Sequence, residues 1–187
     1  PRRSYIVLDS GWYEAEKLSL SGAIDYSIER FYHPDVMSLS PQEWVGQVIA
    51  RLRAQILQPD EVVLDNELNL AVEHGNQPLD ESGHSWWCTE EGYQAIGKWK
   101  WELALQWHAQ TDEDPVLSKI KLAWGPLAPG HDPRTGQHQF PEWEYYILEQ
   151  SWAFRGYHVV HMHSYGDPDD EWTGGRYRRI RDILQDM

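Results

Sequence analysis

The chain has 187 residues, about the length of one domain, and its 30 Asp+Glu against 16 Lys+Arg give a net charge of −14. A chain this acidic repels phosphate backbones and anionic lipid, so we expect neither nucleic acid nor a membrane surface as a partner. Its single Cys88 rules out an internal disulfide and a zinc site built from cysteines.

Strands and helices are predicted to alternate along the chain. The strands are short apolar runs closed by turn residues, and the helices carry apolar residues three and four positions apart. The clearest helix start is Ser40-Pro41 with Glu43, a capping box, and its apolar spacing continues as far as Ile56. In chain order we expect strands over 5–8 and 23–32, a helix from 41 to the turn at 59–60, a strand over 61–64, a helix over 89–110, a strand over 119–124, a helix over 141–156, a strand over 157–163 and a helix over 176–184.

This alternation predicts an α/β fold with a parallel sheet. Helix-to-strand connections are short, whereas strand-to-helix connections are long and polar, as in a (β/α) TIM-type barrel whose sites lie at the carboxyl ends of its strands. A doubly wound sheet would also alternate, but no Gly-rich phosphate loop follows any strand. No linker rich in Gly, Ser or Pro divides the chain, so we expect residues 1–187 to form one domain. We expect no membrane span and no secretory signal in this sequence.

The sharpest motif follows the predicted strand over 61–64. Asp65-Asn66-Glu67 is a run of polar residues that a strand end does not need for its fold. The simpler interpretation is a turn that caps the next segment. The alternative is a group of site residues at the carboxyl end of a central strand.

A second motif, His161-Met-His163-Ser-Tyr165, ends the last predicted strand. Residues 161, 163 and 165 share one face, because side chains alternate along a strand. His-x-His could be half of a metal site, which would need further ligands such as His33 or Asp9 from other strands. The simpler interpretation is a pair of hydrogen-bonded histidines that face the inside of a barrel.

Further residues are expected at the same end of the sheet. Trp124 ends a strand before a Gly/Pro-rich loop, which makes it a candidate platform for stacking on a sugar. The 11 Trp and 10 Tyr against 3 Phe suit such a role, although Trp also fills cores. Arg30 and His33 close the stretch over 23–32 and would lie nearby. The plainer interpretations are ordinary loop chemistry for Trp124 and a surface ion pair for Arg30.

Two of these motifs together resemble clan A glycoside hydrolases, which are (β/α)8 barrels. Asn66-Glu67 resembles the Asn-Glu that ends the fourth strand of that clan and holds the general acid/base, and His163-Ser-Tyr165 resembles the sixth-strand motif of the same pocket. The five predicted strands would then be strands two to six. The resemblance implies a carbohydrate partner. We expect no cofactor and no tightly bound metal, because the chain has neither a cysteine cage nor a Gly-rich phosphate loop. The resemblance also implies Glu67 as general acid/base, with the sugar bound by Asn66, His163, Tyr165, Arg30, His33 and Trp124.

The sequence departs from the clan in one respect. The clan's nucleophile is a Glu at the end of the seventh strand, whereas Met187 falls at the end of the helix after the sixth. We therefore expect an incomplete barrel of about five parallel strands, and a full barrel needs roughly 250 residues. We expect the chain alone to bind sugars weakly and not to hydrolyse aryl glycosides. The alternatives are a non-catalytic carbohydrate-binding relic of a barrel and a metallohydrolase that uses His161 and His163.

Overall fold

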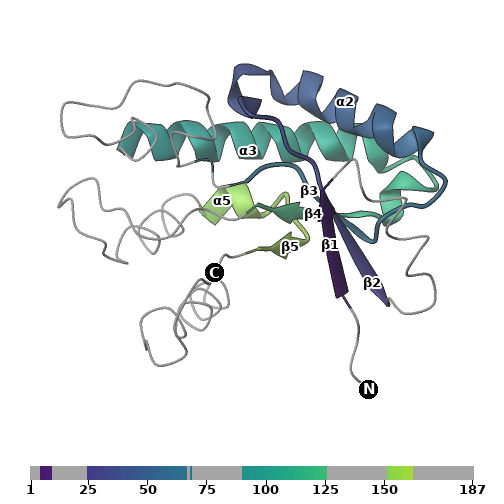
Figure 1. Cartoon of the computed structure of the whole chain (residues 1–187). Helices are drawn as coiled ribbons and strands as arrows, with labels where there is room; N and C mark the ends of the chain where they lie inside the picture. The colour runs from purple at the N-terminus through teal and green to yellow at the C-terminus, as the bar shows by residue number, and fades with distance from the viewer. Residues whose placement is uncertain (1–4, 10–24, 67, 69–89, 126–150, 162–187) are drawn as a thin grey trace, which may run out of the picture.

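The structure, a computed structural model, describes residues 5–9, 25–66, 68, 90–125 and 151–161. Within these ranges one sheet contains five parallel strands, whose order across the sheet is their order along the chain (Figure 1). They are β1 (Tyr5–Asp9), β2 (Tyr26–Arg30), β3 (Glu61–Val63), β4 (Lys121–Trp124) and β5 (Val159–Val160). The predicted α/β fold with a parallel sheet is confirmed.

The α-helices of the described part are α2 (Pro41–Ala54), α3 (Glu90–Thr111) and α5 (Ser151–Phe154), with 3-10 turns η1 (Val36–Ser38) and η3 (Leu117–Lys119) before α2 and β4. The predicted helix over 89–110 is confirmed by α3. The predicted helix over 141–156 is described only from residue 151, and the predicted helix over 176–184 lies outside the described residues. None of the helices described here has both the length and the apolar character needed to cross a membrane.

The capping box predicted before α2 is present. The backbone N–H of Glu43 donates to Oγ of Ser40 (3.2 Å), and the Glu43 carboxylate accepts from the backbone N–H of Ser40 (3.0 Å). These two bonds satisfy donors that the first turn of a helix leaves unpaired. The hydrogen bonds from Ser40, the side-chain one foremost, also lower the pKa of Glu43.

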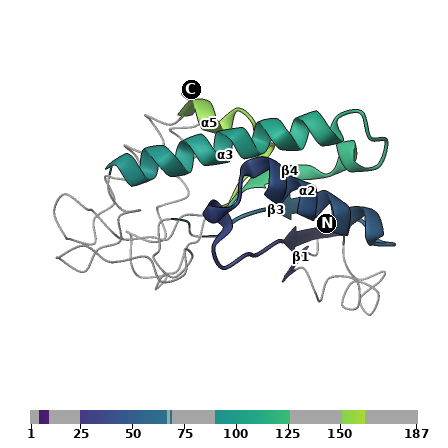
Figure 2. The ribbon, with the colours of Figure 1, turned by 90° about the horizontal axis from the view of Figure 1, so that it is seen from above.

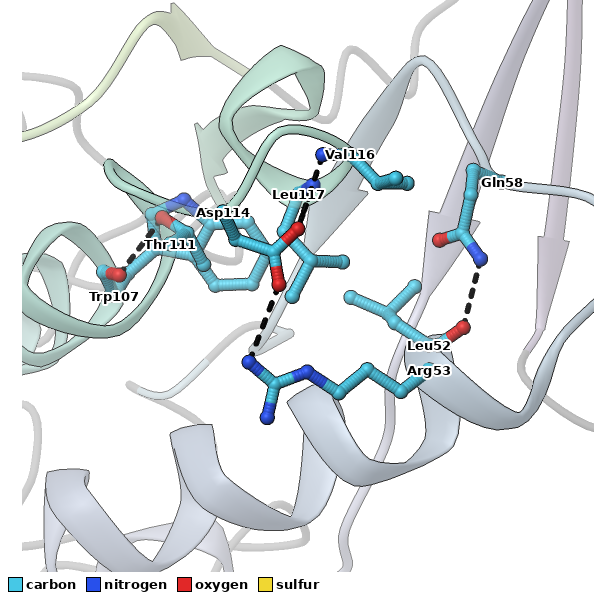
Figure 3. Close-up of polar contacts among 8 residues, drawn as sticks. All are labelled: Leu52, Arg53, Gln58, Trp107, Thr111, Asp114, Val116 and Leu117. Carbon is cyan, nitrogen blue, oxygen red and sulfur yellow. Dashed lines mark hydrogen bonds and ion pairs between the residues drawn. The ribbon is translucent and has the colours of Figure 1, made fainter.

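α2 ends earlier than its apolar spacing predicts. Ala54 is its last residue, and Gln55 is already extended, with φ −80° and ψ 144°. The side chain of Gln58 turns back, and its Nε2 donates to the Leu52 carbonyl (2.7 Å, Figure 3), which satisfies an acceptor in the last turn. Ile56, expected on the apolar side of the helix, is 87% exposed. The prediction that the helix continues to the turn at 59–60 is therefore wrong.

The main core lies between the sheet and the helices. α2 and α3 lie side by side over the same face of the sheet (Figures 1 and 2), and α5 packs against α3. Alternation along the strands directs one set of side chains into this core and the next set to the opposite face. The first set includes Val62, Leu64, Leu122 and Trp124, and the second is Ile28, Val63 and Ala123.

Two tryptophans of the helices fill this core and also fix backbone groups. Nε1 of Trp44 in α2 donates to the Leu64 carbonyl (2.7 Å), just beyond β3. Nε1 of Trp99 in α3 donates to the Leu39 carbonyl (3.2 Å), just before α2. Their ring N–H groups are therefore satisfied inside the protein, as buried polar groups require.

Asp60 fastens the amino-terminal edge of the sheet. Its Oδ2 accepts from the backbone N–H (2.8 Å) and the hydroxyl (2.9 Å) of Ser27 in β2. Its own N–H donates to the Ser27 carbonyl (3.0 Å), and its carbonyl accepts from the N–H of Lys121 in β4 (3.0 Å). One residue thus joins the starts of β2, β3 and β4.

Asp114 links the end of α2 to the turn after α3 (Figure 3). Its Oδ1 accepts from the N–H groups of Val116 (3.0 Å) and Leu117 (3.1 Å), and its Oδ2 pairs with Arg53 (3.2 Å). The two backbone N–H groups, with a smaller effect of Arg53, lower the pKa of Asp114. Thr111 closes the last turn of α3 by donating to the Trp107 carbonyl (2.8 Å).

Candidate functional site

The carboxyl ends of the parallel strands meet at one edge of the sheet. Arg30, the last residue of β2, lies opposite Val63 in register, and β5 pairs with the end of β4. Asp65 and Asn66 come shortly after β3, Gly125 directly after β4 and His161 directly after β5. We call this group, Arg30, Asp65, Asn66, Gly125 and His161, the carboxyl edge.

A buried ion pair lies at the centre of the carboxyl edge. Nζ of Lys100, from the middle of α3, donates to Oδ1 of Asp65 (2.7 Å) and to the carbonyl of Gly125 (2.8 Å). The side chains of Lys100 and Asp65 are 0% and 1% exposed, so water does not screen the pair. The two bonds hold the ends of β3 and β4 to each other and to α3.

The pKa of each residue in this pair depends on the charge of the other residue. Burial raises the pKa of the Asp65 carboxyl, while the charge of Lys100 opposes that rise. Burial likewise lowers the pKa of the Lys100 amine, while Asp65 opposes that fall. The second carboxylate oxygen of Asp65, Oδ2, is buried and has no hydrogen-bond partner in the described part of the chain. Lys100 therefore supplies the main compensation for this buried carboxylate.

Gly125 is required by the same contact. A Cβ added at this position would collide with the carboxylate and the backbone carbonyl of Asp65. Only glycine therefore lets the chain leave β4 this close to Asp65.

Sequence reasoning missed Lys100, although a signal was present. Ile96, Lys100, Leu103 and Trp107 follow one another at intervals of four, three and four, the spacing of a single helix face. The other three side chains are buried in the core. A lysine on such a face predicts a buried carboxylate partner, and Asp65 is that partner.

The structure brings together two residues that the sequence analysis assigned to one site. Nη1 of Arg30, at the end of β2, donates to Oδ1 of Asn66, which follows β3 (3.4 Å). Both side chains are half-buried. The bond lies directly beside Asp65, so the ion pair of Asp65 fixes the backbone that carries Asn66.

His33 contacts its own turn and α2. Its Nδ1 accepts from the backbone N–H of Asp35 (3.1 Å), and its ring meets Trp44 edge-on at 5.8 Å between centroids. Within the described residues its contacts are thus those of a local turn. The structure does not join His33 to Arg30 and Asn66.

Trp124 is a core residue and not an open platform. Its ring stacks on Phe154 of α5 at 4.0 Å between centroids, meets Tyr157 edge-on at 5.0 Å and carries Nζ of Lys100 at 4.2 Å from its centroid. The side chain is fully buried. The reason is alternation along β4, which turns Trp124 with Leu122 toward the helices and leaves Ala123 on the other face.

His161 contacts a carboxylate that the sequence analysis did not consider. Its Nε2 forms an ion-pair contact with Oε1 of Glu61, the first residue of β3. The other oxygen of Glu61 accepts from the hydroxyl of Tyr26 in β2 (2.8 Å). Across the residues that the structure describes, no three His, Cys, Asp or Glu side chains gather where they could hold a metal ion.

Glu67, His163 and Tyr165 lie outside the described residues, so their predicted roles stay predictions. No family model matches the sequence, and no similar protein was found among curated proteins or solved structures.

Proposed function

We propose that this chain forms part of a (β/α) barrel of the glycoside hydrolase type, with a sugar bound at the carboxyl edge and Glu67 as general acid/base. The strand order supports the barrel. In a doubly wound sheet the order reverses at a switch point and helices cover both faces. In the described part of the chain β1 to β5 follow chain order, and α2 and α3 lie over the same face of the sheet, as helices surround a barrel.

The bond from Arg30 to Asn66 is the observation that carries the proposed site. It joins the two residues at the strand ends, where barrels build their sites, and it places a guanidinium and an amide side by side. Both groups form directional hydrogen bonds of the kind that sugar hydroxyls accept and donate. Glu67 follows Asn66 directly in the sequence.

The proposed chemistry needs a second carboxylate near Glu67. A retaining enzyme holds the two carboxyl groups about 5–5.5 Å apart, and an inverting enzyme about 6.5–9.5 Å apart. Asp65 does not fit this role, because Lys100 engages it in the core. The resemblance assigns the nucleophile to a strand after β5, and we propose that β1 to β5 supply the acid/base half of the site.

A non-catalytic sugar-binding domain is the second candidate. Two buried carboxylates on β3 and just after it already have basic partners: Lys100 pairs with Asp65, and His161 contacts Glu61. Neither is available as a nucleophile. A sugar could still bind to Arg30 and Asn66 without being cleaved.

Titration of the protein with a panel of neutral sugars, with calorimetry or NMR as the readout, tests binding. Arg30→Met should weaken binding roughly tenfold or more, the effect of losing one hydrogen bond from a charged donor. The matched control is Arg53→Met on the exposed surface of α2, which should bind as the wild type does. Failure of every sugar to bind would overturn the proposed function.

Activity on aryl glycosides separates the two candidates. Where turnover is found, Glu67→Gln should reduce it about 10²–10⁴-fold, the usual contribution of a general acid. The reduction should be smaller for good leaving groups, because these need less protonation. Glu102→Gln, on the exposed side of α3, is the control. Turnover that Glu67→Gln leaves unchanged would place the chemistry elsewhere, and binding without turnover would favour the second candidate.

A further inference from the structure

Two histidines face each other where α3 meets the start of β5. His108 lies in the last turn of α3, and His158 directly precedes β5. Their ring centroids are 5.5 Å apart. Both rings bond to groups that hold β5 in place, so the protonation of the two rings bears on how this strand is attached.

The backbone before β5 comes unusually close to α3. A Cβ added at Gly156, in the turn after α5, would collide with the side chain of Ala104. Ala104 lies one helical turn before His108, so the two residues share a face of α3. This close approach places the Gly156 carbonyl 2.9 Å from Nε2 of His108. The end of α3 is thereby joined to the segment that leads into β5.

The surroundings of His108 suit a charged imidazolium. Its Nε2 lies against the Gly156 carbonyl, and its Nδ1 lies 3.0 Å from Oδ1 of Asp112. Carbonyl and carboxylate oxygens only accept hydrogen bonds, so each ring nitrogen needs its own proton to form its bond. The last turn of a helix also favours a positive charge. His108 therefore makes both bonds only as a cation.

The surroundings of His158 require the opposite state. Its Nδ1 accepts from the backbone N–H of Leu122 in β4 (3.1 Å), and its own N–H donates to the Leu122 carbonyl (2.9 Å). A backbone N–H only donates, so Nδ1 of His158 must be unprotonated, and the neutral ring carries its proton on Nε2. A second proton would set a donor against a donor and place two cations ring to ring.

We propose that His108 and His158 form an acid-sensitive latch on β5. The latch is closed while His108 carries two ring protons and His158 carries one, and it opens when His158 takes up a second. β5 consists of Val159 and Val160 alone, so the bonds just before it matter for its pairing with β4. His161 follows β5 directly, and opening would also loosen this part of the carboxyl edge. The inference does not depend on the proposed function.

The direction of the pH dependence follows from the bond to Leu122. The folded state engages Nδ1 of His158 without a proton, whereas the unfolded state leaves it free to bind one. The stability from this bond is therefore present near neutral pH and is lost as the pH falls through the range in which histidine titrates. Asp112 is the charged side chain that contacts the pair within the described residues, and it lies beside His108, where it favours the proton on that ring.

NMR of the ring nitrogens tests the two protonation states. In the full chain at about pH 6.5, the middle of the histidine range, His108 should be protonated at both nitrogens and His158 at Nε2 alone. His108→Gln and His158→Asn assign the signals. A neutral His108 under these conditions, or a His158 ring with its proton on Nδ1, would overturn the inference.

Hydrogen exchange of single backbone amides tests the latch itself. The N–H of Leu122 donates to His158, whereas the neighbouring N–H of Lys121 donates to the Asp60 carbonyl (3.0 Å). After correction for intrinsic exchange, the protection of Leu122 should fall roughly 3- to 10-fold between about pH 7.5 and about pH 5.5, the effect of one hydrogen bond. The protection of Lys121 should stay unchanged. Equal behaviour of the two amides would contradict the latch.

Two variants separate the latch from general acid sensitivity. His158→Asn keeps a side-chain acceptor that cannot take up a proton, so Leu122 should stay protected at about pH 5.5. His108→Gln keeps a donor for the Gly156 carbonyl but removes the charge, so Leu122 should lose protection at a higher pH than in the wild type. Lys98→Met, which removes an exposed charge from α3, is the matched control and should follow the wild type. A loss of protection in His158→Asn like that of the wild type would refute the latch, and an unchanged or lower pH of loss in His108→Gln would refute the coupling of the two rings.

Discussion

Replacing Lys100 with methionine keeps most of the side-chain volume and removes the ammonium group. In the native protein that group donates to Asp65 (2.7 Å) and to the Gly125 carbonyl (2.8 Å) at a site where both charged side chains are buried. Lys100→Met leaves the carboxylate unpaired in the core. We expect it to lower the free energy of unfolding by about 3–5 kcal/mol near neutral pH, the usual cost of breaking a buried ion pair.

The size of this loss depends on pH in a defined direction. Burial raises the pKa of Asp65 even against the charge of Lys100, and removing that charge raises the pKa further. A group whose pKa is higher in the folded state than in the unfolded state stabilises the fold at pH values below its unfolded-state pKa, here 3.8. This contribution is lost as the pH rises through the folded-state pKa. The stability difference between wild type and Lys100→Met should therefore be smaller in acid than at neutral pH.

Urea unfolding followed by tryptophan fluorescence measures these differences. Asp65→Asn combined with Lys100→Met removes both charges and should recover most of the loss, because the cost comes from the unpaired carboxylate. The matched control is Lys98→Met, at a position where the side chain is 75% exposed, which should stay within about 0.5 kcal/mol of the wild type. A loss below about 1 kcal/mol for Lys100→Met, or a double variant no more stable than the single one, would refute the reasoning.

Three further changes test the rest of the fold by the same unfolding assay. Gly125→Ala introduces a methyl group that collides with the carboxylate beside it and should cost about 1–3 kcal/mol, and a neutral result would contradict the close approach. Gln58→Ala should cost about 1 kcal/mol because the Leu52 carbonyl loses one of its two donors and keeps only the N–H of Gln55, whereas Ile56→Ala, on an exposed side chain, should change little. Ser40→Ala should cost about 1 kcal/mol. Because Ser40 lowers the pKa of Glu43 from 4.5, the stability from this capping box is present above that value and is lost as the pH falls through the folded pKa.

Local patterns predicted the order of the elements that the structure describes. The capping box at Ser40 and Glu43 is read from three neighbouring residues, and the structure contains it. The end of the same helix depends on a side chain four residues beyond it, because Gln58 folds back onto the last turn. Ile56 continues the apolar spacing but lies after that point. Helix starts are therefore easier to predict here than helix ends.

The candidate site was predicted in part. Arg30 and Asn66 each end or follow a strand, and parallel strands bring such residues to one edge, so their proximity follows from topology. Trp124 also ends a strand, but the face on which it lies depends on how the strand alternates against the helices. The pairing of Lys100 with Asp65 joins residues 35 positions apart, which no local pattern specifies.

The position of Lys100 in α3 has a consequence for how this long helix finds its place. The helix spans 22 residues and buries several large apolar side chains. Hydrophobic contacts alone are not directional, so they would allow α3 to slide along its own axis. A shift by four residues in either direction would bring Ile96 or Ala104 to face Asp65, and neither has a donor for that carboxylate. A single native alignment satisfies the buried acid, so we expect Lys100 to select one docking position of α3 among several that hydrophobic contact would accept.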